Sequence, residues 1–260
     1  MSLLSPKRIH VGLCCGKCWL KVGELQVERT TEIDVDADLT ALQEFFVQAL
    51  SSMLAEVRSK IKPRSTVSIT VSDRLAMIST LPWQETAMSQ SELESFAIFW
   101  LAKFGMKVDE SQLLFANYPR YQAVGLAYAL PKVFVETLAS TVDSAQLKLK
   151  RVIPLSAEVF FSTYFKKVRS STVVVCEETN SLSAWIFDQE GNIHYEIEPV
   201  TASQDQAIKR LFSRISLRYT ELEILDFWGV AKDRVPSEMR DHFPLVKSVN
   251  KLERECWNKP

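Results

Sequence analysis

The apolar and polar positions of the chain change period repeatedly, from the alternation of strands to the three-to-four-residue spacing of helices. In the first part of the chain the pattern predicts a hairpin with its turn at Gly16-Lys17, a third strand, a helix capped by Asp38, and a fourth strand. These elements cover residues 8–14, 18–28, 31–36, 39–61 and 65–72. The N-terminal region therefore has an α/β pattern.

The next stretch predicts a strand, a helix and a second hairpin. They cover residues 75–82, 89–105, 112–119 and 121–131, and Ser89 or Ser91 caps the helix. Four aromatic residues of this helix recur at helical spacing, namely Phe96, Phe99, Trp100 and Phe104. Helical spacing favours an inner, buried face for them, with an exposed docking surface as the alternative.

A helix, a strand and a helix follow, and the α/β pattern then restarts at residue 171. Its second occurrence predicts three strands, a helix and a strand at residues 171–177, 182–188, 193–199, 203–219 and 222–228. The remaining C-terminal stretch is polar and broken by prolines, with at most one short helix. The repetition predicts two α/β lobes, residues 1–170 and 171–260, with the strand–helix–strand–strand unit inserted in the first at about residues 74–130.

Composition excludes several classes of function. The formal net charge is −1 and no basic run is interleaved with aromatic residues, which argues against nucleic-acid binding. No window reaches the roughly 18 consecutive apolar residues of a membrane span, and the N-terminus lacks the apolar core of a signal peptide. We therefore expect a cytoplasmic protein without a direct membrane span. The seven glycines form neither GxGxxG nor GxxxxGK[ST], so the common phosphate-binding loops are missing.

Three of the five cysteines lie in Cys14-Cys15-Gly16-Lys17-Cys18. Three interpretations are open: a metal site completed by His10, a redox site, or small apolar residues in a core hairpin. A structural zinc site needs four ligands, usually from two Cys-x-x-Cys pairs, and the chain has no second pair. Adjacent strand residues also point to opposite faces. The core interpretation is favoured, with no metal.

The order of elements resembles the actin-like superfamily, in particular its bacterial branch formed by the pilus assembly protein PilM and the cytoplasmic part of the secretion protein GspL. The resemblance rests on "IHVGLCCGKCWLKV", "SDRLAMISTLPWQ", "YALPKVFVETL" and "VIPLSAEVFFSTY", and it covers about residues 8 to 230. It implies a two-lobed actin-like (ribonuclease H-like) α/β fold, with an inserted subdomain of the kind also seen in FtsA.

The resemblance also implies where a nucleotide pocket would lie. Nucleotide-binding members begin with Gly-Leu-Asp-x-Gly, and here Cys14 stands at the aspartate position and Gly16 at the turn glycine. In the second lobe, Cys176 takes the aspartate position and Glu178, beside Glu177, takes the glycine position. Trp228 precedes Gly229 where members carry a glycine run. Since Mg²⁺ takes hard oxygen ligands and phosphates need N–H donors, the resemblance predicts a degenerate pocket with no cofactor and no catalytic residue.

The function implied is a non-catalytic scaffold of a type IV pilus or type II secretion-like machine. Its partner would be a bitopic inner-membrane assembly protein or an assembly ATPase, so the protein would be peripheral at the inner membrane, and a homodimer is left open. A partner groove is expected within about residues 75–130, lined by Phe96, Trp100, Tyr118 and Tyr121. The alternatives are an active actin-like ATPase or sugar-kinase-like enzyme, and a metal-binding adaptor.

Overall fold

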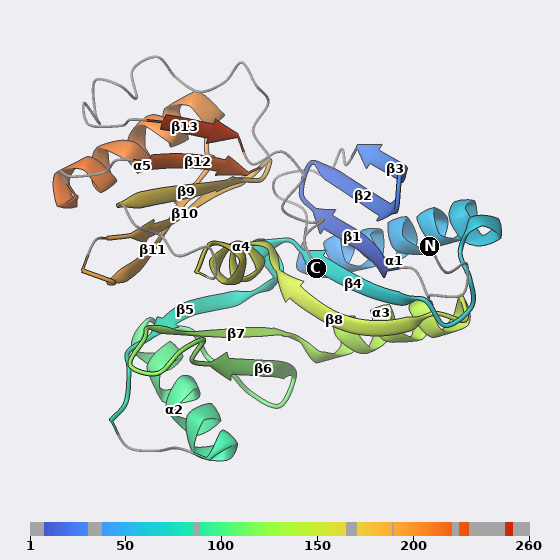
Figure 1. The fold of residues 1–260 in the computed structure, drawn as a ribbon, viewed down its shortest axis with the longest axis horizontal. Coiled ribbons are helices and arrows are strands. Elements are labelled where there is room, and N and C mark those ends of the chain that lie inside the picture. The colour runs from blue at the N-terminus through green and yellow to red at the C-terminus, as the bar shows by residue number, and fades with distance from the viewer. Residues whose placement is uncertain are drawn as a thin grey trace. The chain divides into compact units, whose positions relative to one another are not determined.

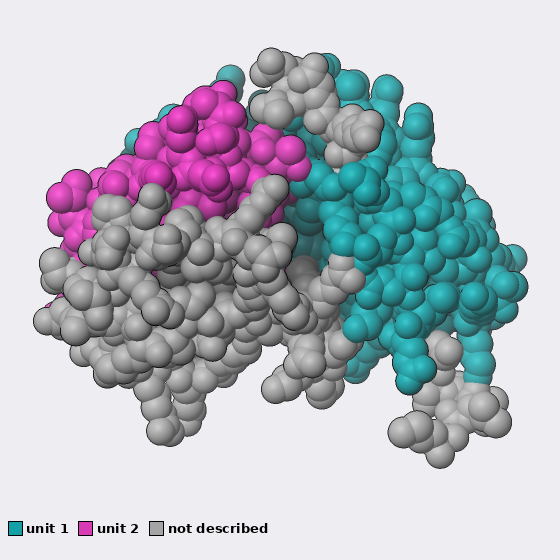
Figure 2. Space-filling model, turned by 90° about the horizontal axis from the view of Figure 1, so that it is seen from above, with its two compact units in different colours: residues 1–78, 98–115, 128–155 teal, residues 79–97, 116–127, 156–260 magenta. Residues whose placement is uncertain are grey.

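The computed structural model describes residues 8–30, 38–85, 89–164, 171–188, 190–219, 224–228 and 248–251. Within it the chain forms two compact units, each assembled from separate stretches (Figure 2). The first contains residues 1–78, 98–115 and 128–155, and the second contains residues 79–97, 116–127 and 156–260. The predicted division into residues 1–170 and 171–260 stays a prediction.

A five-stranded sheet forms the body of the first unit, with strand order β3-β2-β1-β4-β8 (Figure 1). Its strands are β1 (Arg8–Cys14), β2 (Lys17–Val22), β3 (Leu25–Thr30), β4 (Thr66–Val71) and β8 (Lys148–Pro154). The first three form an antiparallel meander, and β4 and β8 add in parallel. The predicted strand 18–28 is wrong in one respect, because a turn at Gly23 (φ +60°) divides it into β2 and β3.

Two helices pack against one face of this sheet, α1 (Leu39–Val57) and α3 (Lys132–Ser144). Short 3-10 turns at Arg58–Lys60 and Asp73–Leu75 flank β4. Along β1, Ile9, Val11 and Leu13 are fully buried, whereas Arg8 is exposed and His10 and Cys14 are half-buried; Gly12 alone among these alternate positions is buried. The period of two predicted from the sequence thus fixes which face of the sheet meets the helices.

The inserted elements are β5 (Met77–Leu81), α2 (Gln90–Lys103), β6 (Gln112–Asn117) and β7 (Gly125–Pro131). Their order along the chain is strand, helix, strand, strand, as predicted, and the strands form a sheet of order β5-β7-β6. Ser89 and Glu92 form a capping box: the Glu92 N–H donates to Ser89 Oγ, and the Ser89 N–H donates to the Glu92 carboxylate at 2.7 Å.

The inner face of α2 differs from the prediction. Leu93, Ala97 and Leu101 are the buried positions, while Phe99 and Phe104 are 57% and 59% exposed. Aromatic residues at helical spacing do share a face, but a second, aliphatic stripe is the one that packs inward. The helical spacing of the aromatic residues predicted that they form the buried face of α2, and this is wrong for Phe99 and Phe104.

The second unit repeats the topology of the first with a sheet of order β11-β10-β9-β12-β13. Its strands are β9 (Thr172–Glu177), β10 (Ser181–Phe187), β11 (Ile193–Pro199), β12 (Ile224–Trp228) and β13 (Ser248–Lys251). Again an antiparallel meander is extended by parallel strands. Strand β13 was not predicted, because its four residues lie in a polar stretch.

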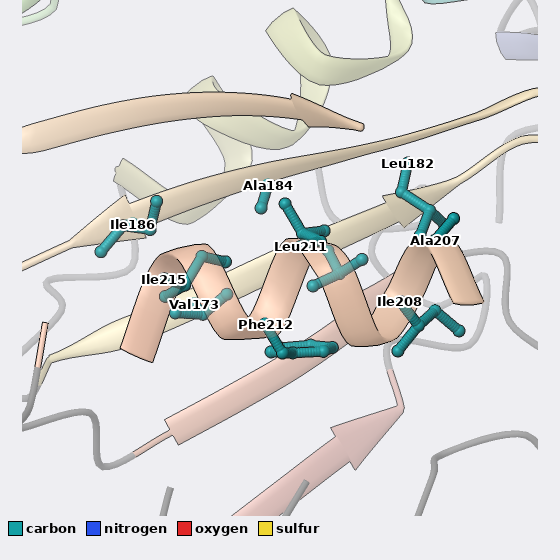
Figure 3. Close-up of a cluster of buried hydrophobic side chains, with 10 residues drawn as sticks. Val173, Leu182, Ala184, Ile186, Ala207, Ile208, Leu211, Phe212 and Ile215 are labelled. Atoms are coloured by element: carbon teal, nitrogen blue, oxygen red, sulfur yellow. The ribbon is translucent and has the colours of Figure 1, made fainter. Parts of the chain in front are cut away.

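Helices cover both faces of this second sheet. On one face, α5 (Gln204–Arg218) packs Leu211, Phe212 and Ile215 against Val173 and its strand neighbours (Figure 3). On the other face, the ring of Trp185 lies 5.0 Å from that of Phe160 in α4 (Leu155–Tyr164). The Trp185 Nε1–H also donates to the Ser156 carbonyl oxygen at 2.8 Å.

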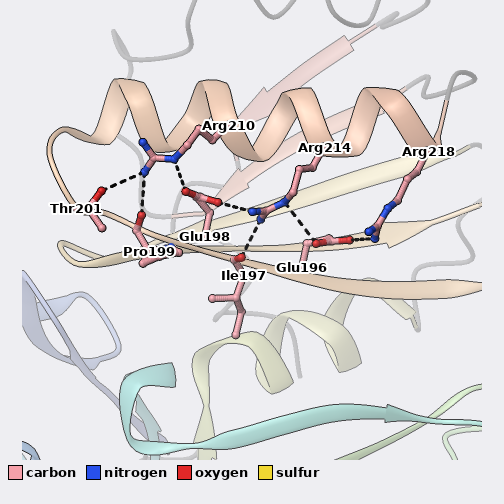
Figure 4. A network of polar contacts seen from close by, with 8 residues as sticks. All are labelled: Glu196, Ile197, Glu198, Pro199, Thr201, Arg210, Arg214 and Arg218. Carbon is pink, nitrogen blue, oxygen red and sulfur yellow. Dashed lines mark hydrogen bonds and ion pairs between the residues drawn. The ribbon is translucent and has the colours of Figure 1, made fainter. Parts of the chain in front are cut away.

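Ion pairs also join helix α5 to the edge strand β11 (Figure 4). Glu198 has a side chain only 5% exposed, and it pairs with Arg210 Nε and Arg214 Nη1, both at 2.5 Å. The two arginines donate further to the carbonyl oxygens of Pro199 and Ile197. Arg218 pairs with Glu196 one turn along. These bonds occupy outward carbonyls of an edge strand, which limits pairing with another chain.

None of the helices in the described part of the chain has the length and hydropathy needed to cross a membrane.

Candidate functional site

The predicted pocket positions of the first unit lie at the turn between β1 and β2. Cys14 is the last residue of β1 and is half-buried. It is in register with Lys17, so both side chains project from the same face of the hairpin. Gly16 has φ +95°, the left-handed conformation that favours glycine in a tight turn. Cys14 therefore presents a thiol on the same face as the Lys17 ammonium group, which pairs with Glu28 at 2.5 Å.

The two neighbouring cysteines belong to the core. Cys15 is buried, with its Sγ 3.3 Å from Ser72 Oγ, and Cys18 is fully buried on β2. Burial, with a contribution from Cys15, raises the pKa of the Cys18 thiol to about 12. Metal ligation and thiol redox chemistry both need the thiolate, which this environment disfavours. Within the described residues no group of three or more His, Cys, Asp or Glu side chains could hold a metal ion.

Sequence reasoning missed the role of Trp19 at this hairpin. Gly12 is in register with Trp19, and a Cβ on Gly12 would lie only 2.2 Å from the indole Nε1. The indole therefore lies directly over the Gly12 backbone, on the face that carries Cys14 two residues further on. A Gly-x6-Trp spacing across a predicted hairpin was the available signal, because it places the two residues opposite each other.

In the second unit, the corresponding strand end is more deeply buried. Cys176 is 1% exposed and is in register with Ser183, whose Oγ lies 2.7 Å from Ser156 Oγ of α4. Glu177, the last residue of β9, is half-buried. Glu178 is 3% exposed, and its N–H donates to the Ser181 carbonyl oxygen at 2.9 Å in the turn to β10. Two carboxylate residues thus stand at the end of β9 and the start of the turn to β10.

Trp228 is the last residue of β12 and is in register with Cys176 on the neighbouring strand. The structure therefore brings together two positions that are 52 residues apart in the sequence. Gly229 lies outside the described residues.

Two of the predicted groove residues meet through a third aromatic residue, Trp83, which was not predicted. The rings of Tyr118 and Tyr121 each lie 5.1 Å from the Trp83 ring, in edge-on geometry. Tyr118 is fixed: its hydroxyl donates to the Pro82 carbonyl oxygen at 2.8 Å, and a Cβ on Gly125 would lie 2.6 Å from its ring. Burial raises the Tyr118 pKa. Tyr121, by contrast, is 80% exposed.

The other two predicted groove residues, Phe96 and Trp100, are half-buried and one turn apart on α2. The Trp100 ring lies 5.7 Å from that of Phe104. Lys103 Nζ lies 4.8 Å from the Trp100 ring centroid and 4.7 Å from that of Phe99, within cation–π range. Trp100 thus belongs to a cluster with Phe104 and Lys103, and its Nε1 atom is itself buried.

Comparison with solved structures places this architecture. A chain of the PilM–PilN type IV pilus biogenesis complex matches with a TM-score of 0.70, at 11% identity, over 96% of this chain and 89% of that one. A protein of Bacteroides thetaiotaomicron with an actin-like ATPase fold and unknown function matches with a TM-score of 0.62, at 13% identity, over 97% and 94%. The chain has an actin-like fold.

A third match is the cytoplasmic domain of EpsL, an inner-membrane component of the type II secretion system of Vibrio cholerae. Its TM-score is 0.51, at 10% identity, over 95% of this chain and 86% of that one. No protein-family model and no curated protein sequence matches the chain. The predicted fold class and the resemblance to the PilM and GspL branch are confirmed, and at these identities the match concerns the fold.

Proposed function

We propose that this chain is a non-catalytic actin-like scaffold of a type IV pilus or type II secretion-like assembly machine, peripheral at the inner membrane through a partner. The observation that carries the proposal is the similarity in fold to the PilM–PilN chain over 96% of the sequence, at a TM-score of 0.70. The similarity to the EpsL cytoplasmic domain supports the same setting. The partner would be a bitopic inner-membrane assembly protein or an assembly ATPase.

The chemistry of the pocket positions supports a non-catalytic role. Mg²⁺ prefers carboxylate and other hard oxygen ligands, and Cys14 presents a sulfur with Lys17 beside it. The turn at Glu177 and Glu178 brings negative charge toward the place of a phosphate. Like charges 4 Å apart repel by about 4 kcal/mol at an effective dielectric near 20. These residues do not fit a magnesium nucleotide held in the usual actin-like manner.

The aromatic residues of the insertion supply the contact surface. Tyr118 and Trp83 form a fixed base, and Tyr121 is the exposed member of the group. Large aromatic side chains with a polar tip are frequent contact residues at protein interfaces. We assign the partner segment to the surface formed by Trp83, Tyr118 and Tyr121.

Site-specific photocrosslinking tests this assignment. A photoreactive phenylalanine replaces Tyr121 in one variant and Leu217, an 85% exposed residue of α5, in the control. We expect position 121, and not position 217, to crosslink a membrane protein identified by mass spectrometry as an assembly component. Equal crosslinking at both positions, or none at position 121 in intact cells, contradicts the docking surface.

The alternative is an active nucleotide-binding enzyme of the same fold. Binding of a fluorescent ATP analogue with Mg²⁺ separates the two. We expect no saturable binding at micromolar concentrations. Micromolar affinity that is lost in Cys14→Ala would establish the alternative and overturn the scaffold.

A further inference from the structure

The face of the first sheet opposite α1 and α3 carries two rows of polar residues. Residues in register on neighbouring strands share a face, so the pairings of β1, β2, β3, β4 and β8 define the rows directly. One row contains Gln26, Lys21, His10, Ser68 and Arg151. The next contains Arg8, Thr66 and Lys148.

These rows are accessible. Arg8, Lys148 and Arg151 are exposed, and Lys21 and His10 are half-buried. The opposite face, by contrast, buries Ile9 and Val11 completely. At these two rows the sheet is therefore covered by helices on one side and presents charged side chains on the other, whereas the next row on that second side is packed, with Gly12 and Thr70 buried.

The charge on these two rows has one sign, whereas the next row on the same face carries Glu28, which pairs with Lys17. The cations of the two rows are Arg8, Lys21, Lys148 and Arg151, together with Lys150 at the register shift of β8. We call these five residues the basic face. None of the residues in the two rows is acidic, although the chain as a whole has a net charge of −1. Burial lowers the pKa of His10 most, and the positive charges of Arg151, Arg8, Lys150 and Lys21 lower it further, so four of the five cations act on one place.

The ligand that matches this surface is flat and anionic, and any apolar part of it lies beneath its charged groups. The two rows offer no apolar or aromatic side chain that could anchor a peptide or stack a nucleic-acid base, and the Trp19 indole of the next row lies against the Gly12 backbone. Strands lie about 4.8 Å apart and alternate residues about 6.8 Å apart, so the cations form a flat array. Such an array meets a layer of phosphate headgroups without any insertion into hydrocarbon.

We propose that the basic face binds the anionic headgroup surface of a bilayer directly. This goes beyond the proposed scaffold function and does not depend on it, because it requires neither the partner nor the aromatic residues of the insertion. Its consequence is orientation: a weak electrostatic contact would set which side of the chain faces the membrane.

Vesicle co-sedimentation with the full chain tests the proposal. One set of vesicles contains equal parts of phosphatidylglycerol and phosphatidylcholine, and the other contains phosphatidylcholine alone. We expect binding to the first set only, weakening as salt rises because the Debye length falls from about 30 Å at 0.01 M to about 8 Å at 0.15 M. Equal binding to both sets, or binding insensitive to salt, overturns the proposal without any variant.

Matched triple variants locate the contact. Arg8→Gln, Lys21→Gln and Lys148→Gln together remove three cations of the basic face. Lys60→Gln, Lys107→Gln and Lys132→Gln remove three exposed cations from outside it. Since each cation near an anionic surface contributes about fivefold to binding, we expect the first variant to lose roughly 100-fold in partition coefficient and the control to lose far less.

Equal losses in the two variants would mean that only net charge matters, and would overturn the assignment to this face. Binding of an acidic polypeptide or a DNA oligonucleotide by a chain that ignores anionic vesicles would overturn the membrane as the occupant. We expect crosslinking from position 121 to be unchanged in the first triple variant. A loss of vesicle binding by that variant would then concern the basic face and leave the proposed scaffold function untouched.

Discussion

In the first sheet, β1 buries Ile9, Val11 and Leu13 and exposes Arg8, whereas in the second sheet β9 is buried at every position from Thr172 to Cys176. The strand orders are the same, a meander followed by two parallel strands. The difference lies in the helices: α5 and α4 cover opposite faces of the second sheet, and α1 and α3 share one face of the first.

This difference teaches how one topology serves two purposes. A sheet covered on both sides needs apolar residues at consecutive positions, and it offers no surface for binding. A sheet covered on one side can alternate, and its second face is then available for charge. Cys14 and Cys176, at corresponding strand ends, accordingly differ in burial.

The largest predicted effect is the difference in stability loss between alanine substitutions at two tryptophans, Trp185 and Trp19. Trp185→Ala removes a fully buried indole and its hydrogen bond to Ser156, and we expect a loss of about 3–5 kcal/mol in the free energy of unfolding. Trp19→Ala, on the half-buried face of the first sheet, should cost about 1–2 kcal/mol. Urea denaturation followed by circular dichroism measures both. Equal losses would contradict the difference in coverage.

A smaller effect is expected at Gly12, where the first sheet is most tightly packed on its polar face. Gly12→Ala forces a methyl group against the Trp19 indole and should destabilise by about 1–3 kcal/mol. In Trp19→Ala the same substitution should cost little, because the obstruction is gone. A double-mutant cycle measures this coupling, and additive effects would show that the contact is unimportant.

The raised pKa of Cys18 predicts that the free energy of unfolding depends on pH in the alkaline range. Its folded pKa of about 12 lies above the ordinary thiol value of 9.0, so the unfolded chain loses this proton first and stability falls as pH rises from 9.0 toward 12. Relative to Cys18→Ala, the wild type should lose about 1.4 kcal/mol between about pH 8 and pH 10. Parallel stability curves for the two proteins would mean that the thiol ionises as easily in the folded state.

The smallest effects compare two serines. Ser183→Ala breaks a buried hydrogen bond to Ser156 in the covered sheet, and we expect about 1 kcal/mol of destabilisation. Ser68→Ala, in the polar row of the first sheet, should stay within about 0.5 kcal/mol of wild type. Thermal and urea denaturation of the pair provide the check, and a larger loss in Ser68→Ala would show that this row is packed.

Much of the fold could be predicted because its signals are local. The alternation in β1, the helical spacing of α1 and the capping box at Ser89 each depend on residues a few positions apart. The turn at Gly23 was missed because the flanking strands continue the same alternation through it. Strand β13 was missed because a parallel edge strand is specified by its neighbour, and its own four residues are not apolar.

The candidate site likewise has one part that could be predicted before the structure and another part that only the tertiary structure shows. The local pattern predicted the strand ends at Cys14, Glu177 and Trp228, and the family resemblance singled out Gly16, Cys176 and Glu178 beside them. Only the tertiary structure decided that Trp83 joins Tyr118 to Tyr121, that Trp19 lies over Gly12, and that Phe99 faces outward. Each of these depends on packing between elements, and a side chain's spacing in the sequence does not specify which neighbour it will meet. The basic face is the clearest case, since its cations come from three strands and meet only when the sheet forms.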